Sequence, residues 1–328
     1  QEYMDRDTAL DHAVKLHVKR IRVNVLWART LVDGGHHRTL PATGPVYDFS
    51  RIDALEAAAG ARGIKLQLTL TGPAPAWATG NHKVGPNRPS AKKFGEFART
   101  VATHFEHRVD RYAIWNEPNL RPWLAPTKRA PKLYRALYTA GYNAIKTVDR
   151  DADVLIGEVS PTGDRRAIPP LKFLRGVTCS KRNYKVARRC KPLKADGFAL
   201  HPYQLTAAPQ RAFGRRDDVP ISRLSRLTKA LDKLARRRAL RTPRGRALDL
   251  YLTEFGYLSA GNRKVTPRRR AKWMSAAYKI ARRNPRVRQL LQYQLVDPPR
   301  GERWHSALLD HRGKPQPVYG KLARASRR

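Results

Sequence analysis

Short apolar runs alternate with longer amphipathic stretches along nearly the whole chain. The run from Arg20 to Trp27 is typical, with Ile21, Val23 and Val25 on one face of an extended segment. The expected strands cover 20–27, 65–71, 111–116, 153–158, 196–201, 248–253 and 288–295. The expected helices cover 5–17, 51–61, 90–106, 131–148, 166–176, 221–238, 267–284 and 316–326. Strands that alternate with helices in this way predict a parallel sheet with helical crossovers.

This alternation predicts an α/β fold of the (β/α)8 TIM-barrel type. We expect a single catalytic domain over residues 1–328, because no linker or low-complexity stretch divides the pattern. Seven strands are visible and a closed barrel needs eight, so the first strand is either short, within residues 1–4, or missing from this chain. A doubly wound open sheet is the alternative, but the residues after Trp27 lack the Gly-rich phosphate turn that such a sheet normally has.

Two glutamates are the candidate catalytic residues. Glu117 lies in Trp-Asn-Glu-Pro-Asn (115–119), and Glu254 lies in Thr-Glu-Phe-Gly (253–256). Each comes at the end of an apolar run of the kind that forms a buried parallel strand. The carboxyl ends of the strands meet at one face of a barrel, so both side chains can reach one pocket. Two carboxyl groups that face one sugar bond are what glycoside hydrolysis requires.

These two motifs resemble those of clan GH-A, the retaining glycoside hydrolases with a TIM-barrel fold. The chain looks most like family 39 and related bacterial members of the clan. In that clan an Asn precedes the acid/base Glu at the end of strand four, and the nucleophile Glu ends strand seven. With 20–27 as strand two, Glu117 and Glu254 fall at these positions. The resemblance implies a retaining O-glycoside hydrolase that acts through a covalent glycosyl-enzyme, with Glu117 as acid/base and Glu254 as nucleophile.

The resemblance also implies roles for four supporting residues. Asn116 resembles the clan residue that contacts the sugar 2-hydroxyl, with a turn-forming Asn as the alternative. His201 and Tyr203 end strand six, where the tyrosine is expected to hold Glu254 and the histidine to orient the site or simply to end a strand. Arg22 is expected to steady the nucleophile if it points inward, and to be a surface residue if it points outward.

Other residues near the strand ends are candidates for substrate binding. Trp27, Trp77 and Trp123 could stack on a sugar face, although packing within the loops is an equally good interpretation. Glu158 ends strand five and is either a substrate contact or a structural acid.

Strand eight departs from the clan pattern. Many clan members have a Trp late in this strand, beneath the sugar, whereas this chain has Tyr293 and Gln294 there. We expect these two residues to contact the substrate, with Trp304 and Asp297 in the following loop as compensation.

The charge of the chain is strongly positive. It has 67 Lys and Arg against 26 Asp and Glu, a net charge of +41. Such a charge attracts polyanions. A noncatalytic barrel that binds a polyanionic glycan or another polyanion is therefore the alternative function. For an enzyme, the expected partner is an oligo- or polysaccharide, acidic glycans included. We expect no specific nucleic acid as partner, because no nucleic-acid-binding motif is evident.

Cysteine and histidine usage adds further expectations. Cys179 and Cys190 bracket a basic loop and would form a disulfide in an exported protein, with two free thiols as the alternative. The ten histidines show no paired ligand spacing, so we expect neither a metal nor a cofactor.

The chain contains no run of about 18 apolar residues, so we expect no membrane span. We expect a secreted or cell-envelope-associated protein whose export signal is not visible in this chain.

Overall fold

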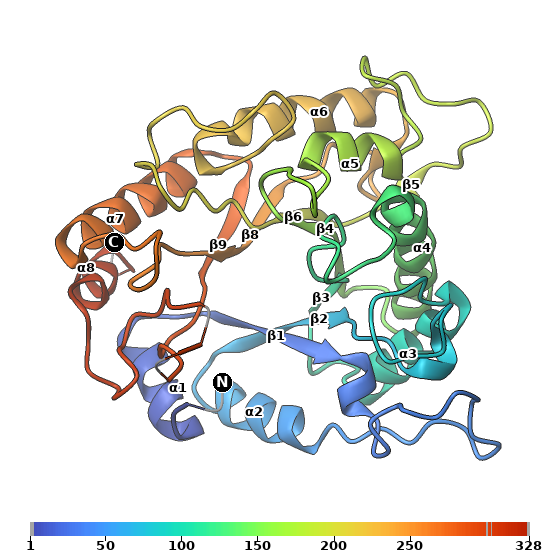
Figure 1. The fold of residues 1–328 in the computed structure, drawn as a ribbon, viewed down its shortest axis with the longest axis horizontal. Coiled ribbons are helices and arrows are strands. Elements are labelled where there is room, and N and C mark those ends of the chain that lie inside the picture. Colours follow the sequence, from blue (N-terminus) through green and yellow to red (C-terminus); the bar gives the residue numbers. More distant parts are fainter. Residues whose placement is uncertain (1–2, 300, 303, 327–328) are drawn as a thin grey trace.

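A curled parallel sheet forms the centre of the molecule. The computed structural model describes residues 3–299, 301–302 and 304–326. Seven strands pair in the order β1-β2-β3-β4-β6-β8-β9, and every pairing is parallel. Their bounds are β1 (Arg20–Leu26), β2 (Lys65–Thr71), β3 (Arg111–Ile114), β4 (Asp153–Val159), β6 (Gly197–Leu200), β8 (Leu250–Phe255) and β9 (Val287–Gln292). Figure 1 shows the sheet enclosed by a ring of helices, which confirms the TIM-barrel architecture.

Eight helices cover the outside of this sheet in the described part of the chain. They are α1 (Arg6–Lys15), α2 (Ser50–Gly60), α3 (Ala91–His104), α4 (Ala130–Val148), α5 (Pro170–Val177), α6 (Leu224–Arg236), α7 (Pro267–Arg283) and α8 (Pro317–Ser326). The amphipathic pattern explains their placement, since α6 buries Leu224, Leu227, Leu231 and Leu234 on one face. Helix α5 begins four residues later than predicted, because Pro170 occupies its first turn, where a missing N–H is tolerated.

The eighth strand is not found among the described residues. No ladder joins β1 to β9 there, and residues 3–5 form a turn and bend that lead into α1. Residues 1–2, to which the predicted short first strand also extends, lie outside the described residues. None of the described helices is long and apolar enough to cross a bilayer.

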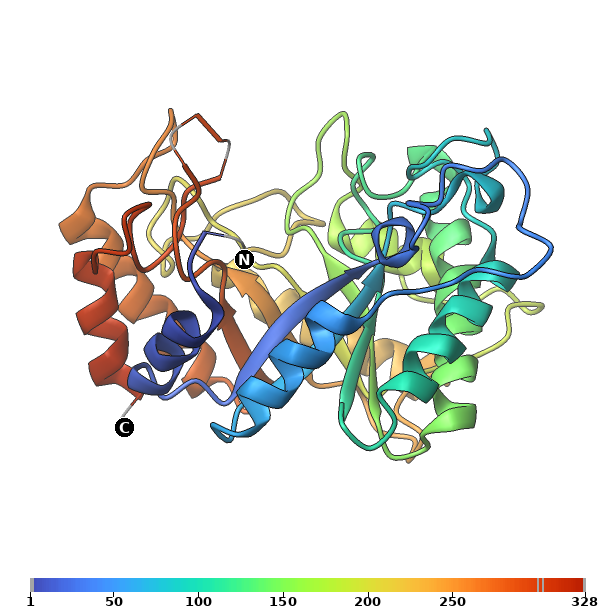
Figure 2. The same ribbon diagram turned by 90° about the horizontal axis from the view of Figure 1, so that it is seen from below.

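A second, two-stranded sheet was not predicted from the sequence. Strands β5 (Leu193–Lys194) and β7 (Leu240–Arg241) pair in parallel, with Leu193 and Leu240 buried. They lie shortly before β6 and β8 in the chain and therefore at the end of the barrel where those strands begin. Figure 2 shows the strands and helices side by side, with long connections gathered at one end of the barrel.

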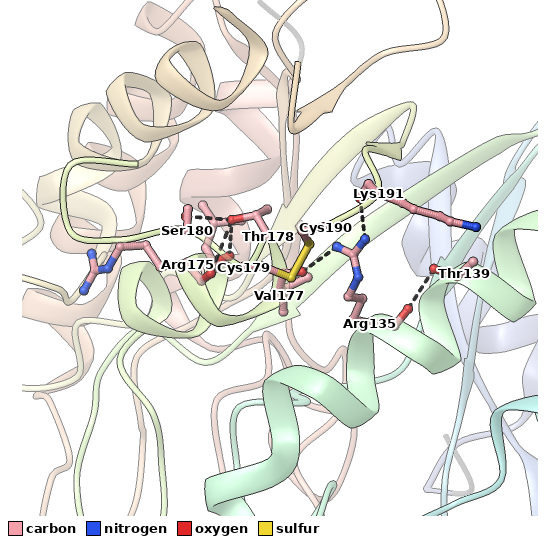
Figure 3. The surroundings of a disulfide bond; sticks show 10 residues. Arg135, Thr139, Arg175, Val177, Thr178, Cys179, Ser180, Cys190 and Lys191 are labelled. Carbon is pink, nitrogen blue, oxygen red and sulfur yellow. Dashed lines mark hydrogen bonds between the residues drawn. A yellow bond between two sulfur atoms is a disulfide. The ribbon is translucent and has the colours of Figure 1, made fainter. Parts of the chain in front are cut away.

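Cys179 and Cys190 form a disulfide that closes the basic loop, as expected for the paired alternative (Figure 3).

A bond across a loop of this length reduces the conformational entropy of the unfolded chain. We expect the double substitution Cys179→Ala/Cys190→Ala to lower the free energy of unfolding by about 3 kcal/mol. Urea unfolding of the oxidised protein measures this loss. Dithiothreitol should lower the stability of the unsubstituted protein by the same amount and leave the variant unchanged. Equal stability of the oxidised protein and the variant would contradict the prediction.

Candidate active site

Arg22 lies at the centre of a buried polar cluster inside the barrel. Its Nε and Nη2 donate to the two carboxylate oxygens of Glu158, at 2.9 and 2.5 Å. Its Nη1 donates to Glu254 Oε1 at 2.8 Å, and Nη2 also donates to Asn116 Oδ1 at 2.6 Å. Burial alone lowers the pKa of Arg22, but Glu158 and Glu254 outweigh it, so the pKa of Arg22 is raised and the side chain stays charged. Arg22 thus points into the barrel. Its guanidinium group binds side chains that lie at or just after the ends of β3, β4 and β8.

A β-bulge in β4 positions Glu158. The pairing of β4 with β6 shifts between Gly157 and Val159, and Glu158 has a φ of 47°. Gly157 is required next to it, since a Cβ there would lie 2.4 Å from the backbone oxygen of Ala199. A bulge of this kind redirects a side chain. The carboxylate of Glu158 faces Arg22, while its backbone oxygen accepts a hydrogen bond from the Glu117 N–H at 3.0 Å.

The carboxylates of Glu117 and Glu254 both lie close to one ring nitrogen of His201. His201 Nδ1 lies 3.1 Å from Glu117 Oε1 and 3.5 Å from Glu254 Oε2. These two oxygens are therefore less than about 7 Å apart, which fits two carboxyl groups that share one sugar bond. Both side chains are partly accessible, at 16% for Glu117 and 11% for Glu254, whereas Glu158 is fully buried.

The surroundings of Glu117 and His201 shift the pKa of each group. Burial raises the pKa of Glu117, and the negative charge of Glu254 adds to this rise, while His201 opposes it. Burial lowers the pKa of His201, but the carboxylates of Glu254 and Glu117 outweigh it and the pKa of His201 is raised. Glu117 is therefore the carboxyl group whose surroundings favour the protonated form. Glu254 accepts hydrogen bonds from two donors that stabilise a carboxylate.

The second of these donors is the phenol of Tyr203, which donates to Glu254 Oε2 at 3.0 Å. Burial and the nearby Glu254 raise the pKa of Tyr203 well above its usual value, so the phenol keeps its proton. Trp304 packs edge-on against Tyr203 with ring centroids 5.2 Å apart, and Tyr293 lies 6.3 Å from Trp304. Tyr293 and Trp304 are half-buried and form an aromatic wall beside Glu254. Burial and the charge of Glu254 raise the pKa of Tyr293 to about 12.

No described cluster of three or more His, Cys, Asp or Glu side chains has the arrangement of a metal site.

A comparison with protein families agrees with this geometry. The family described as "Cellulase (glycosyl hydrolase family 5)" matches residues 1–287, which is most of the chain. The chain belongs to glycosyl hydrolase family 5. This membership confirms the clan GH-A resemblance of the two glutamate motifs. A search of curated proteins finds no match.

Solved structures similar to this family 5 chain share its fold at low sequence identity. A family 39 glycoside hydrolase from Bacteroides cellulosilyticus has a TM-score of 0.73 at 19% identity, over 98% of this chain and 60% of that one. A monomeric β-xylosidase from Caulobacter crescentus has a TM-score of 0.62 at 18% identity, over 98% and 64%. A family 1 β-glucosidase from Thermotoga maritima has a TM-score of 0.63 at 17% identity, over 99% and 86%. The chain spans less than two thirds of the length of the first two.

Three of the expected substrate contacts are buried in this family 5 chain. Trp27 is fully buried because the chain turns into a 3₁₀ helix (Trp27–Thr30) after β1, and its ring stacks on Phe97 at 5.4 Å. Trp77 is 5% exposed and packs edge-on against Trp27. The carboxylate of Glu158 is held by Arg22, which corresponds to the structural-acid interpretation. The burial of these three side chains agrees with the other interpretation given for each, which is packing within the loops for Trp27 and Trp77 and a structural acid for Glu158.

Two further candidates lie nearer the solvent. Trp123 is half-buried, and its backbone oxygen accepts a hydrogen bond from Trp115 Nε1 at 2.8 Å, so it packs in the loop after β3. Gln294 has a φ of 71° and is half-buried directly after Tyr293. A substrate-binding role for each stays a prediction.

Sequence reasoning missed three polar residues of β2 that support the site. Gln67 and Thr69 donate to Glu158 Oε1 at 3.4 and 3.2 Å, and Thr71 Oγ1 accepts from the Asn116 N–H at 3.0 Å. All three are buried. Their signal is present in the sequence, because Gln67, Thr69 and Thr71 alternate with leucines in one strand and so share one face of the sheet. That face points into the barrel, toward Arg22.

Proposed function

We propose that this protein is a retaining O-glycoside hydrolase that cleaves its substrate by double displacement. The observation that carries this proposal is the approach of the Glu117 and Glu254 carboxylates to the same His201 nitrogen, at 3.1 and 3.5 Å. Retaining enzymes place the two carboxyl groups roughly 5–5.5 Å apart, so that one of them reaches the anomeric carbon directly. The hydrogen bonds of Arg22 and Tyr203 to Glu254 support its assignment as the nucleophile.

In the first step, Glu254 attacks the anomeric carbon and forms an ester with the sugar. The bond from that carbon to the leaving oxygen breaks, and protonated Glu117 gives its proton to this oxygen. The raised pKa of Glu117 suits this role. We propose that the amide NH2 of Asn116 donates to the sugar 2-hydroxyl, because Arg22 occupies its Oδ1.

In the second step, Glu117, now a carboxylate, removes a proton from water, and the oxygen of this water attacks the anomeric carbon. The ester to Glu254 breaks and the carboxylate of Glu254 returns. The hydrogen bonds to Arg22 and Tyr203 stabilise this carboxylate as a leaving group. Two inversions at one carbon restore the original anomeric configuration.

The substrate is proposed to be a β-linked oligo- or polysaccharide. The family description names cellulase, and the similar structures include a β-xylosidase and a β-glucosidase. Aryl β-glucosides, aryl β-xylosides and cello-oligosaccharides are therefore the first substrates to test, with an aryl glucuronide for an acidic sugar.

Trapping the intermediate tests this mechanism. A 2-deoxy-2-fluoro glycoside with a good leaving group should add one fluorosugar to the protein, and peptide mass spectrometry should place it on Glu254. Proton NMR of the first product should show the anomeric configuration of the substrate. Initial inversion, or a label on another residue, would refute the proposal.

The pKa of Glu117 predicts the pH profile of the reaction. The first step needs protonated Glu117, so kcat/KM should fall as the pH rises through the pKa of this residue, which lies above the ordinary 4.5. His201 lowers the pKa of Glu117. The substitution His201→Asn removes a potential positive charge and should move the alkaline limb to higher pH. An alkaline limb of the kcat/KM profile that stays at the same pH, or moves to lower pH, would contradict the expected direction.

We propose an extracellular or cell-envelope location for this protein. The disulfide between Cys179 and Cys190 supports this proposal, because such bonds persist in oxidising compartments. Cell fractionation with a thiol-alkylation assay tests it. Cytoplasmic protein with two reactive thiols would refute it.

The alternative of a noncatalytic polyanion-binding barrel is not favoured. Family membership and the paired carboxylates both support an enzyme.

A further inference from the structure

We propose that the end of the barrel opposite the candidate active site carries a second binding surface, one that binds acidic polysaccharides. Two segments form it. Residues 181–194 contain seven Lys and Arg and no Asp or Glu, and residues 233–246 also contain seven and none. All of these cations are exposed except Arg241, which is half-buried. We call the cationic side chains of these two segments the basic platform.

The structure joins the two segments into one surface. Strands β5 and β7 pair in parallel, so Lys194 lies beside Arg241. A second contact lies further along, where Lys233 Nζ is 5.8 Å from the ring centroid of Tyr184. Segments separated by some forty residues in the chain thus lie side by side and bring their positive charges together.

Covalent and polar contacts hold the first segment in place. The disulfide between Cys179 and Cys190 closes its loop (Figure 3). Arg135 in α4 donates to the backbone oxygen of Val177 at 2.8 Å and also to that of Lys191. A surface that is already ordered loses less conformational entropy when it binds a ligand.

The cations of the platform form no ion pair with the described carboxylates of the protein. Within the described parts of the chain, no carboxylate lies within 4.0 Å of a cationic nitrogen of the platform. The nearby acids pair with other cations, since Asp196 bonds to Lys146 at 2.9 Å and Asp249 bonds to Arg286 at 2.8 Å. A polyanion would release the counterions that such a surface holds and would reduce the repulsion between its cations.

The platform is distant from the candidate active site. Strands β5 and β7 lie just before β6 and β8, whereas Glu254 lies at the far end of β8 and Glu117 follows β3. A polymer bound at the platform therefore leaves the catalytic carboxylates free. The platform would hold the protein on a polyanionic matrix while the other end of the barrel remains open to substrate.

The surface favours an acidic polysaccharide over a nucleic acid. Tyr184 is the one aromatic residue of the two segments, and it is buried, so the platform offers no exposed ring on which a base could stack. A partner that carries carboxylate or sulfate groups needs no such ring. The choice of a glycan also rests on the proposed action of the protein on carbohydrate.

Binding to polygalacturonate tests the proposal without any measurement of hydrolysis. The affinity of the full chain for immobilised polygalacturonate is measured at several salt concentrations, with dextran as the neutral polymer and double-stranded DNA as the other polyanion. The platform variant combines Lys181→Glu, Lys185→Glu, Arg188→Glu and Arg189→Glu. The matched control makes the same charge change at exposed residues of α3 and α7 and combines Lys92→Glu, Arg99→Glu, Arg268→Glu and Lys272→Glu.

We expect the platform variant to bind polygalacturonate at least about tenfold more weakly and with a smaller salt dependence, and the control to change by less than about threefold. Dextran should not bind. Equal weakening of both variants would overturn the proposal in favour of a general charge effect. Tighter binding of DNA than of polygalacturonate would overturn it in favour of a nucleic-acid surface. If the glutamate variant does not fold, the corresponding four-alanine variants of both sets give the same comparison. Hydrolysis of aryl glycosides should be equal in all folded variants, and a protein without hydrolysis still gives the binding result.

Discussion

Replacement of Glu254 by glutamine lowers kcat/KM on an activated aryl glycoside by about 10⁴-fold or more if this residue is the nucleophile. The amide has the shape of the carboxylate but cannot form the ester with the anomeric carbon. The glutamine oxygen can accept from Arg22 and its NH2 can donate to the phenol oxygen of Tyr203, so the fold should be retained. Initial rates on aryl β-glucosides and β-xylosides measure the loss, and circular dichroism checks the fold.

Azide separates the roles of the two glutamates. It should restore turnover to Glu117→Ala and give a glycosyl azide of retained configuration, because azide then attacks the ester on Glu254. It should restore turnover to Glu254→Ala with the inverted product, because azide then replaces the nucleophile. The same product configuration from both variants would refute the assignment of roles.

The second large effect is expected on stability. Substitution of Arg22 by methionine should lower the free energy of unfolding by about 3–5 kcal/mol, the usual cost of leaving a buried charge without its partner. Glu158 is fully buried and loses the two hydrogen bonds from the guanidinium group, and Glu254 loses one. Urea unfolding at constant pH measures this cost.

Arg20 provides the matched control, since it lies two residues earlier in β1 and pairs with Asp110, whose side chain is 43% exposed. Arg20→Met should cost about 1 kcal/mol or less. The double substitution Arg22→Met/Glu158→Leu should recover much of the stability, because both buried charges are then absent. Its activity should stay low, since Glu254 still lacks its cationic partner. A cost for Arg22→Met as small as that for Arg20→Met would show that the buried cluster contributes little to stability.

The order of elements and the two catalytic candidates could be predicted from the sequence. The apolar runs predicted the bounds of the seven strands to within a few residues. The Glu117 and Glu254 motifs lie at strand ends that a barrel brings together. The direction of Arg22 stayed open at this level and is given by the structure, in which its side chain points inward to Glu158 and Glu254.

The direction of other side chains could not be predicted, because local backbone geometry decides it. The bulge in β4 redirects Glu158 into the cluster, and strand periodicity contains no signal for a shift of this kind. The 3₁₀ turn after β1 likewise places Trp27 among the aromatic side chains of α3. The pairing of β5 with β7 involves two residues from each strand, too few to leave a pattern in the sequence.

Glu158 links the positions of the two candidate catalytic carboxylates. Its backbone oxygen binds the N–H of Glu117, and its side chain binds Arg22, which in turn holds Glu254. The spacing of these two carboxylates is thus set by contacts with strands β1 and β4. A change elsewhere in the connections around the mouth of the barrel would leave these contacts in place.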